Sequence, residues 1–139
     1  MSKTAQIARR QFEFRLDMHS GVPVYRQIID QVQAALAAGT LNVGDQLPTV
    51  RQVSVDLAIN PNTVMRAYRE MEIRGITETQ QGTGTFITQR KVPRSTADQE
   101  RRLQQLVSEF VARAGAGGFT LAELINALKE RADDVDPER

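Results

Sequence analysis

The segment from Asn60 to Gly75, NPNTVMRAYREMEIRG, carries signals for both ends of an α-helix. Asn60 is a favourable N-cap, Pro61 fits the first helical turn because its missing N–H is not needed there, and Gly75 favours the left-handed conformation that ends a helix. Apolar residues between these ends recur at helical spacing and predict one buried stripe: Val64, Ala67, Tyr68 and Met71. A helix with fixed ends and a fixed buried face constrains everything that packs against it.

The opposite face of this helix carries Asn62, Arg66 and Arg69. Asparagine pairs bidentately with adenine and arginine with guanine, and a recognition helix reads DNA mainly with its first turns. An ordinary surface helix also exposes amide and guanidinium groups, so this helix alone does not decide between the two interpretations.

The residues before this helix predict a short strand and a first core helix. Phe12, Phe14 and Leu16 alternate with charged residues, a period of two that is typical of a strand with one buried face. We therefore expect an N-terminal segment with a short strand over residues 1–21. After Pro23, apolar residues at helical spacing predict a helix that stops at Gly39: Tyr25, Ile28, Ile29, Val32 and Leu36.

A short second helix is predicted between a loop at residues 40–48 and the helix from Asn60. Leu47 is the expected apolar anchor of that loop. Thr49 and Gln52 have the spacing of a capping box. Apolar residues then face one way over barely three turns: Val50, Val53 and Leu57. About three residues separate this helix from the next, which is the helix-turn-helix arrangement.

A β-hairpin is predicted directly after the second helix of this motif. Residues 76–80 and 85–88 have strand composition, and Gly82-Thr83-Gly84 marks the bend between them. Such a hairpin is a wing, and its glycine tip leaves room for close approach to a nucleic-acid backbone. Glycine is also what any tight hairpin needs, so the tip taken alone does not establish DNA binding.

These segments together resemble a known family of regulators. Residues 23–88 are similar to the winged helix-turn-helix of the GntR family of bacterial transcription regulators, and most closely to its small YtrA-like subfamily. Four ordered blocks carry the resemblance: PVYRQI at 23–28, GDQLPTVRQ at 44–52, NPNTVMRAYREMEIRG at 60–75 and QGTGTF at 81–86. The resemblance implies a homodimer that binds a pseudo-palindromic double-stranded DNA operator, usually as a repressor that controls its own operon or transport genes.

The resemblance also implies roles for particular residues. It places Arg51 on the DNA backbone or a base, the first turns of the 60–75 helix in the major groove, and the hairpin tip in or near the minor groove. Larger members of the family often have basic residues where this chain has Pro61 and Met65, so base contacts are not carried over to those two positions. With Arg69 from the same helix face, the predicted DNA-binding residues are Arg51, Asn62, Thr63, Arg66, Arg69, Gln81, Gly82 and Thr83.

The C-terminal third of the chain predicts two further helices after a linker at residues 91–95, which contains Pro93. Thr96 with Gln99 can open the first of them, and Gly115 to Gly118 must break it. Thr120 with Glu123 forms another capping box for the second, which ends before a frayed tail at residues 133–139.

The predicted helices of residues 96–132 have broad apolar stripes that an isolated hairpin cannot bury. Self-association is the economical solution, although the two helices would also be buried if they padded a monomeric core. The predicted dimerisation residues are Leu103, Leu106, Val107, Phe110, Val111, Leu121, Leu124, Ile125 and Leu128. Two short helices leave little room for a ligand cavity, so no small-molecule effector is expected, with a small site at the dimer interface left open.

Composition argues against an enzyme, a cofactor and a membrane partner. The chain has no cysteine, and its one histidine, His19, lies in a predicted turn beside Ser20-Gly21. No catalytic residue, metal ligand or cofactor is therefore predicted. The N-terminus lacks an apolar signal region, and no apolar run is long enough to span a membrane, so we expect a cytoplasmic protein.

The charge of the predicted winged domain keeps a rival interpretation open. Residues 22–90 contain six Arg and six Asp or Glu, a net charge of zero, where a basic surface would be typical of DNA binding. A winged helix that binds a protein partner and no DNA would fit this neutrality. The predicted fold class is α+β but mainly α, with a winged helix-turn-helix at residues 22–90 and a short C-terminal helical hairpin.

Overall fold

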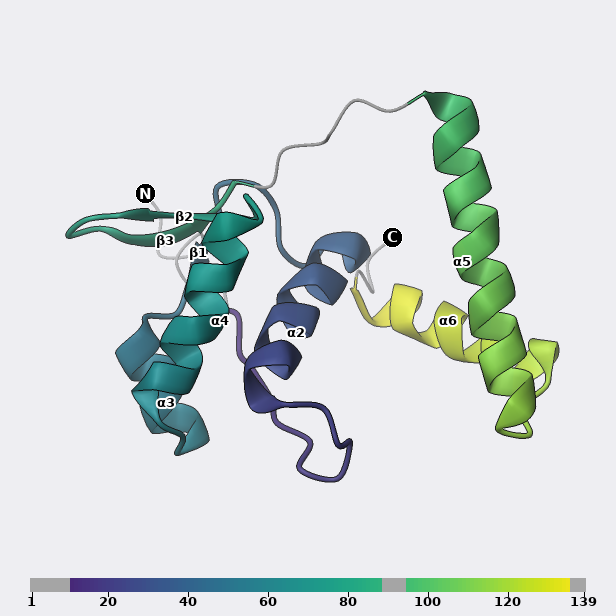
Figure 1. Ribbon diagram of the computed structural model, residues 1–139, viewed down its shortest axis with the longest axis horizontal. Helices are drawn as coiled ribbons and strands as arrows, with labels where there is room; N and C mark the ends of the chain where they lie inside the picture. Colours follow the sequence, from purple (N-terminus) through teal and green to yellow (C-terminus); the bar gives the residue numbers. More distant parts are fainter. Residues whose placement is uncertain (1–10, 89–94, 136–139) are drawn as a thin grey trace. The chain divides into compact units, whose positions relative to one another are not determined.

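The structure, a computed structural model, describes residues 11–88 and 95–135 (Figure 1). The chain divides into two compact units, Met1–Arg90 and Lys91–Arg139. Residues 91–94 of the predicted linker, residues 1–10 and residues 136–139 of the predicted tail lie outside the described part. None of the described helices is both long and apolar enough to cross a membrane.

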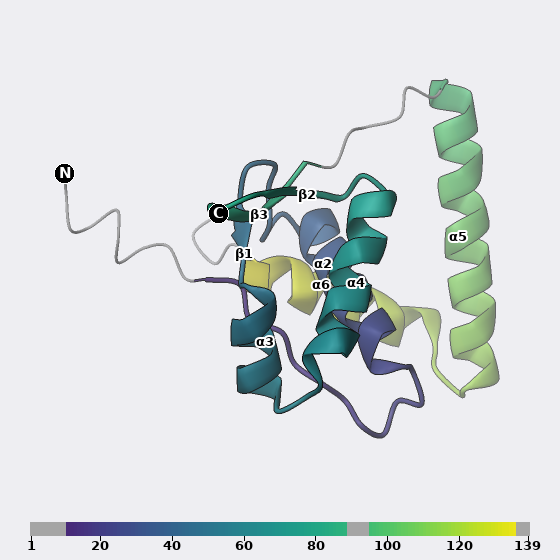
Figure 2. The ribbon, with the colours of Figure 1, turned by 60° about the vertical axis from the view of Figure 1, so that its left-hand side comes forward.

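The first unit combines three helices with a small antiparallel sheet (Figures 1 and 2). The helices are α2 (Val24–Ala38), α3 (Val50–Leu57) and α4 (Pro61–Ile73), and α4 packs against both of the others. The strands are β1 (Gln46–Leu47), β2 (Thr77–Gln80) and β3 (Gly84–Ile87), in the order β1-β3-β2. This mainly helical α+β fold with its helix-turn-helix and wing confirms the predicted fold class.

The core of this unit is built on the apolar stripe of α4. Val64, Ala67 and Met71 have no exposed surface and Tyr68 is 6% exposed, so all four predicted positions are buried. They meet other fully buried side chains from α2 and the sheet: Ile28, Ile29, Val32, Leu47 and Ile87. The helical spacing of the sequence thus identified the face on which the unit assembles.

The ends of α4 are also as predicted. The Asn60 side chain accepts a hydrogen bond from the Asn62 N–H at 2.9 Å, Pro61 lies in the first turn, and Gly75 is left-handed with φ of 76°. At α3, Thr49 caps the Gln52 N–H at 3.1 Å, but the Gln52 side chain does not return to close the box. It donates to the Gln11 side chain at 3.1 Å.

The short strand predicted around Phe12 and Phe14 is wrong. Residues 11–17 have no regular secondary structure, although the alternation of buried and exposed side chains is present and Phe14 is buried. Side-chain amides of α2 take the place of a neighbouring strand. Gln31 accepts from the Arg15 N–H at 2.8 Å and donates to the Arg15 carbonyl at 2.6 Å, and Gln27 accepts from the Asp17 N–H at 2.9 Å.

Conversely, a strand exists where a loop was predicted. Gln46 and Leu47 form β1, which lies opposite Phe86 and Thr85 of β3. A two-residue strand is too short for a periodic pattern, and its pairing partner lies far along the chain. The prediction that Leu47 anchors this region is confirmed, since Leu47 is 1% exposed.

The second unit consists of α5 (Thr96–Ala116) and α6 (Leu121–Val135). The N-cap of α5 is Ser95, whose side chain accepts from the Asp98 N–H at 3.2 Å, one residue before the predicted start. Gly115 lies within α5, so the break occurs only after Ala116. The capping box predicted before α6 is complete. The Thr120 N–H donates to the Glu123 carboxylate at 3.1 Å, and the Glu123 N–H donates to the Thr120 hydroxyl at 3.2 Å. The helix continues to Val135, beyond the predicted end at 132.

One buried hydroxyl ties the two helices of the helix-turn-helix together. Tyr68 of α4 donates to the carbonyl oxygen of Pro48, two residues before α3 begins. Burial raises the pKa of Tyr68 well above its usual value, because the phenolate form would lose its hydration. The neutral hydroxyl therefore persists at all physiological pH values and remains a donor.

Replacing Tyr68 by Phe should destabilise this unit while leaving its packing volume nearly unchanged. The Pro48 carbonyl would lose its only described donor, and a buried acceptor without a partner costs about 1–3 kcal/mol. Urea denaturation followed by circular dichroism measures the change. Tyr25→Phe is a matched control, since Tyr25 is only partly buried and its hydroxyl makes no described hydrogen bond. Equal stability of the two variants would contradict this role for Tyr68.

Candidate nucleic-acid interface

The outer face of α4 presents the predicted base-reading side chains. Asn62, Met65, Arg66 and Arg69 are exposed and Thr63 is half-buried. Asn62, Arg66 and Arg69 follow one another at intervals of four and three residues, so they share one face of the helix. All of them lie in the first nine residues of the 13-residue helix, the part that a recognition helix inserts into the major groove.

The acidic residues of α4 have partners other than the arginines of this face. Glu70 pairs with Arg74 at 3.2 Å, and Glu72 accepts a hydrogen bond from the Thr79 N–H of β2 at 2.9 Å. Within the described part of the chain, Arg51, Arg66 and Arg69 form no ion pair. Residues 22–90 have a net charge of zero, yet three of their guanidinium groups are available for phosphate oxygens or base edges.

Arg66 has a partner of another kind. Its guanidinium carbon lies 3.9 Å from the centroid of the Tyr25 ring, on the second residue of α2. Sequence patterns assigned Tyr25 to the apolar stripe of α2, and its ring does pack against the core on one side. No spacing rule connects residues on two separate helices, so this contact could not be predicted from the sequence.

Arg51 occupies the first turn of α3, immediately after the Thr49 cap. Its side chain is exposed, while its carbonyl accepts a hydrogen bond from the Ser54 hydroxyl at 2.8 Å. The N-terminus of a helix carries a partial positive charge, which adds to that of the guanidinium. Arg51 is therefore suited to a phosphate contact.

The wing tip consists of Gln81, Gly82 and Thr83, all of them exposed. Gly82 is left-handed with φ of 76°. The Thr83 N–H donates to the Gln80 carbonyl at 3.0 Å, and the Thr83 carbonyl accepts from the Gln46 side chain at 3.0 Å. Both backbone groups of Thr83 are thus used within the turn, which leaves its hydroxyl for an external contact.

Gln46 braces this tip from β1 in a way that the sequence did not indicate. A Cβ atom built on Gly84 would lie 2.4 Å from the Gln46 Nε2 atom, and Gly84 has φ of 136°. The backbone conformation favours glycine at position 84, and a Cβ atom there would displace the Gln46 side chain. The predicted glycine bend therefore also makes room for the Gln46 side chain.

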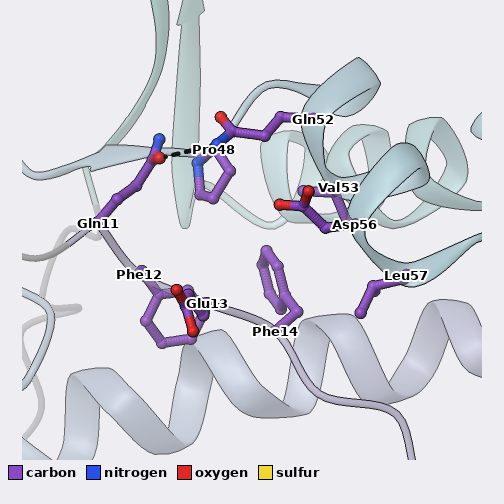
Figure 3. Close-up of a pocket in the computed structure, with 9 residues that line it drawn as sticks. All are labelled: Gln11, Phe12, Glu13, Phe14, Pro48, Gln52, Val53, Asp56 and Leu57. Atoms are coloured by element: carbon purple, nitrogen blue, oxygen red, sulfur yellow. Dashed lines mark hydrogen bonds between the residues drawn. The ribbon is translucent and has the colours of Figure 1, made fainter.

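A groove of about 760 Å³ opens between the N-terminal segment and α3 (Figure 3). Phe14 and Val53 contribute apolar walls, and the Asp56 carboxylate and Gln52 amide extend from α3 toward the N-terminal segment. The hydrogen bond between Gln52 and Gln11 crosses one side of this groove. Its lining includes none of the predicted DNA-binding residues.

The arrangement defines a class of protein. A helix-turn-helix whose second helix exposes amide and guanidinium groups, followed by a glycine-tipped hairpin, is a winged helix-turn-helix DNA-binding unit. The described elements assign the predicted DNA-binding residues to three places in this one unit: the start of α3, the outer face of α4 and the wing tip.

Comparisons with known proteins identify the family. Residues 24–87 match the family described as "Bacterial regulatory proteins, gntR family". The HTH-type transcriptional repressor YtrA of Bacillus subtilis is 33% identical over 121 residues, which cover 87% of this chain and 93% of that protein. The HTH-type transcriptional regulator Rv1152 of Mycobacterium tuberculosis is 38% identical over 120 residues, which cover 86% and 94%.

Solved structures agree with this assignment. A GntR family transcriptional regulator from Listeria monocytogenes has a TM-score of 0.54 and 31% identity, with 81% of this chain and 98% of that chain covered. A transcriptional regulator from Oenococcus oeni has a TM-score of 0.52 and 31% identity, with coverage of 83% and 95%. The chain belongs to the GntR family and is a DNA-binding transcription regulator. This family consists of regulators and not of enzymes.

Gly84→Ala should weaken operator binding, because alanine is strained at the positive φ of this position and its Cβ atom displaces the Gln46 side chain that braces the wing. We expect a loss of about fivefold, the size of one weakened backbone contact at roughly 1 kcal/mol. Fluorescence anisotropy with a labelled operator measures it.

Gly39→Ala is the matched control, since Gly39 also has a positive φ but has open space around its Cβ position. Gln46→Ala removes the clash, so Gly84→Ala should have a smaller effect in the Gln46→Ala background than alone. Additive effects of the two substitutions would contradict the proposed brace.

Proposed function

We propose that this regulator is a homodimeric repressor that binds a pseudo-palindromic operator with α4 in the major groove and the wing in or near the minor groove. The observation that carries the proposal is the outer face of α4, where Asn62, Arg66 and Arg69 are exposed and the arginines have no described carboxylate partner. Such groups bind base edges and phosphates, and they are not needed to hold the fold.

Each predicted residue has a role that its surroundings support. Asn62 and Arg66 lie on the first turns of α4 and suit base edges, whereas Arg69 lies one turn later and suits a phosphate. Arg51 suits a phosphate because it extends from the N-terminal turn of α3. Gln81, Gly82 and the Thr83 hydroxyl remain for the wing contact, and Thr63, half-buried, adds a short hydroxyl beside Asn62.

Repression is supported by the similarity to YtrA of Bacillus subtilis, which is named as a transcriptional repressor. When its operator overlaps a promoter, the bound regulator would exclude RNA polymerase from that promoter. We propose that its own operon or transport genes are the targets, and that it acts in the cytoplasm, where chromosomal DNA is accessible.

Dimerisation is supported by the apolar surface of the second unit. No residue of α5 is buried, and Leu106 and Phe110 are 52% and 47% exposed. Five further apolar side chains of α5 and α6 are also exposed: Leu103, Val107, Leu121, Ile125 and Leu128. Val111 and Leu124 are half-buried. A soluble chain rarely leaves such a surface uncovered. A two-fold axis through it would suit two recognition helices about 34–36 Å apart, one turn of B-DNA.

Selection of DNA from a randomised pool by the purified full chain tests the operator. We expect enrichment of an inverted repeat with half-sites about one helical turn apart, without any added small molecule. Asn62→Ala and Arg66→Ala should each weaken binding to the selected site by about 1–3 kcal/mol, the worth of one bidentate base contact.

Val43→Ala serves as the control, because Val43 is a 69% exposed loop residue that the proposed interface does not use. A pool that shows no enrichment with the wild-type protein would contradict sequence-specific binding. Enrichment only in the presence of an added metabolite would contradict the expectation that no effector is needed.

The dimer is tested by placing charges on the apolar surface of α5. Leu106→Glu combined with Phe110→Glu should give a monomer in sedimentation velocity, because two carboxylates would be buried at the interface. Operator affinity should fall by at least tenfold through the loss of the second half-site. Val43→Glu places one such carboxylate on a more exposed residue of the first unit and should leave the dimer intact. A double variant that still sediments as a dimer would exclude this surface.

A further inference from the structure

The stacking of Arg66 on Tyr25 has a consequence for how α4 reads DNA. Arg66 is exposed, yet its guanidinium is not free to sample all its rotamers, since it lies 3.9 Å above an aromatic ring from another helix. A planar guanidinium on an aromatic face is held by cation–π attraction and by flat contact between the two planes. The ring therefore restricts the position of the guanidinium, and flat stacking on the ring is the arrangement that would also restrict its plane.

The platform itself is fixed. Tyr25 lies in the first turn of α2 and is partly buried, with its ring packed against the core that α2 shares with α4. Neighbouring α2 residues Ile28 and Ile29 are fully buried, so this end of α2 is anchored. Because α2 and α4 share this core, Tyr25 keeps its position relative to the recognition helix and supports Arg66 there.

Local charges reinforce this arrangement. Glu70 lies four residues after Arg66 and could have attracted it, but Glu70 pairs with Arg74 at 3.2 Å. An acidic residue four positions before a basic one is the favourable order on a helix, and Glu70 with Arg74 has that order. Arg66 contacts the Tyr25 ring and not a carboxylate of its own helix.

We infer that Tyr25 is a specificity-determining positioning residue: it holds the guanidinium of Arg66 in the plane in which Arg66 reads one guanine in each half-site. This inference rests on the proposed contact of Arg66 with base edges. Guanine offers its O6 and N7 acceptors side by side in the major groove, and a guanidinium meets both only when the two planes nearly coincide. A guanidinium fixed before binding loses less freedom on contact and discriminates more sharply against other bases.

Tyr25 does not need its hydroxyl for this role. Among the described residues the hydroxyl has no hydrogen-bond partner, so it could instead donate to a DNA phosphate. The two roles differ in their consequences, because a phosphate contact supports affinity for all sequences, whereas stacking supports preference at one base pair.

The test is a selection profile of half-site preferences, recorded with the full-length wild type and with Tyr25→Phe, Tyr25→Leu and Arg66→Lys. Tyr25→Phe keeps the ring and should retain the wild-type profile. Tyr25→Leu removes the ring, and guanine preference at one position of each half-site should fall about tenfold while the other positions keep theirs. Arg66→Lys leaves Tyr25 intact and should lose preference at that same position, which covers the case in which Tyr25→Leu does not fold.

Phe12→Leu is the matched control, since it removes another half-buried aromatic ring of the same unit that does not contact Arg66. Its profile should stay that of the wild type. A folded Tyr25→Leu protein with an unchanged profile would overturn the inference, and so would a uniform loss of affinity with Tyr25→Phe. Failure of the wild type to enrich any site would instead refute the proposed operator binding, so the two failures are distinguishable.

Discussion

The burial of one stripe of α4 is the constraint on which the rest of the winged unit depends. Val64, Ala67, Tyr68 and Met71 are buried against α2, α3 and the sheet, so the opposite face of the helix must point outward. The Tyr68 hydroxyl bonds to the Pro48 carbonyl and thereby joins the start of α3 to the middle of α4. Because the core fixes the rotation of α4 about its own axis, it also fixes which side chains are offered to DNA.

Residues 22–90 have no net charge and can still bind a polyanion, because the acidic side chains of α4 are engaged within the fold. Glu70 pairs with Arg74 at the end of the same helix, and Glu72 accepts a hydrogen bond from the backbone of β2, which links the wing to α4. The arginines at the start of α3 and along α4 are left without carboxylate partners in the described part of the chain. Net charge summed over a domain hides this division, which explains why the neutral charge of the sequence kept a protein-binding alternative open.

The second unit has a different physical problem. Its two helices have well-formed caps at Ser95 and Thr120, yet no residue of α5 is buried. Caps and helix propensity define the helices but do not hide apolar side chains from water. In the proposed dimer a second copy of the chain covers this surface, which would link the two DNA-binding units on an operator of proposed two-fold symmetry.

Local sequence determined the helix ends at Asn60, Gly75 and Thr120, the buried face of α4 and the glycine bend of the wing, because capping, helical periodicity and turn formation involve residues only a few positions apart. The four sequence blocks also identified the family. Only the tertiary structure decided that residues 11–17 are held by α2 glutamines in place of a strand, that Gln46 braces Thr83 37 residues away, and that Tyr25 supports Arg66. These contacts join segments whose proximity depends on the packing of the whole core, and such proximity has no signature in the spacing of residues along the chain.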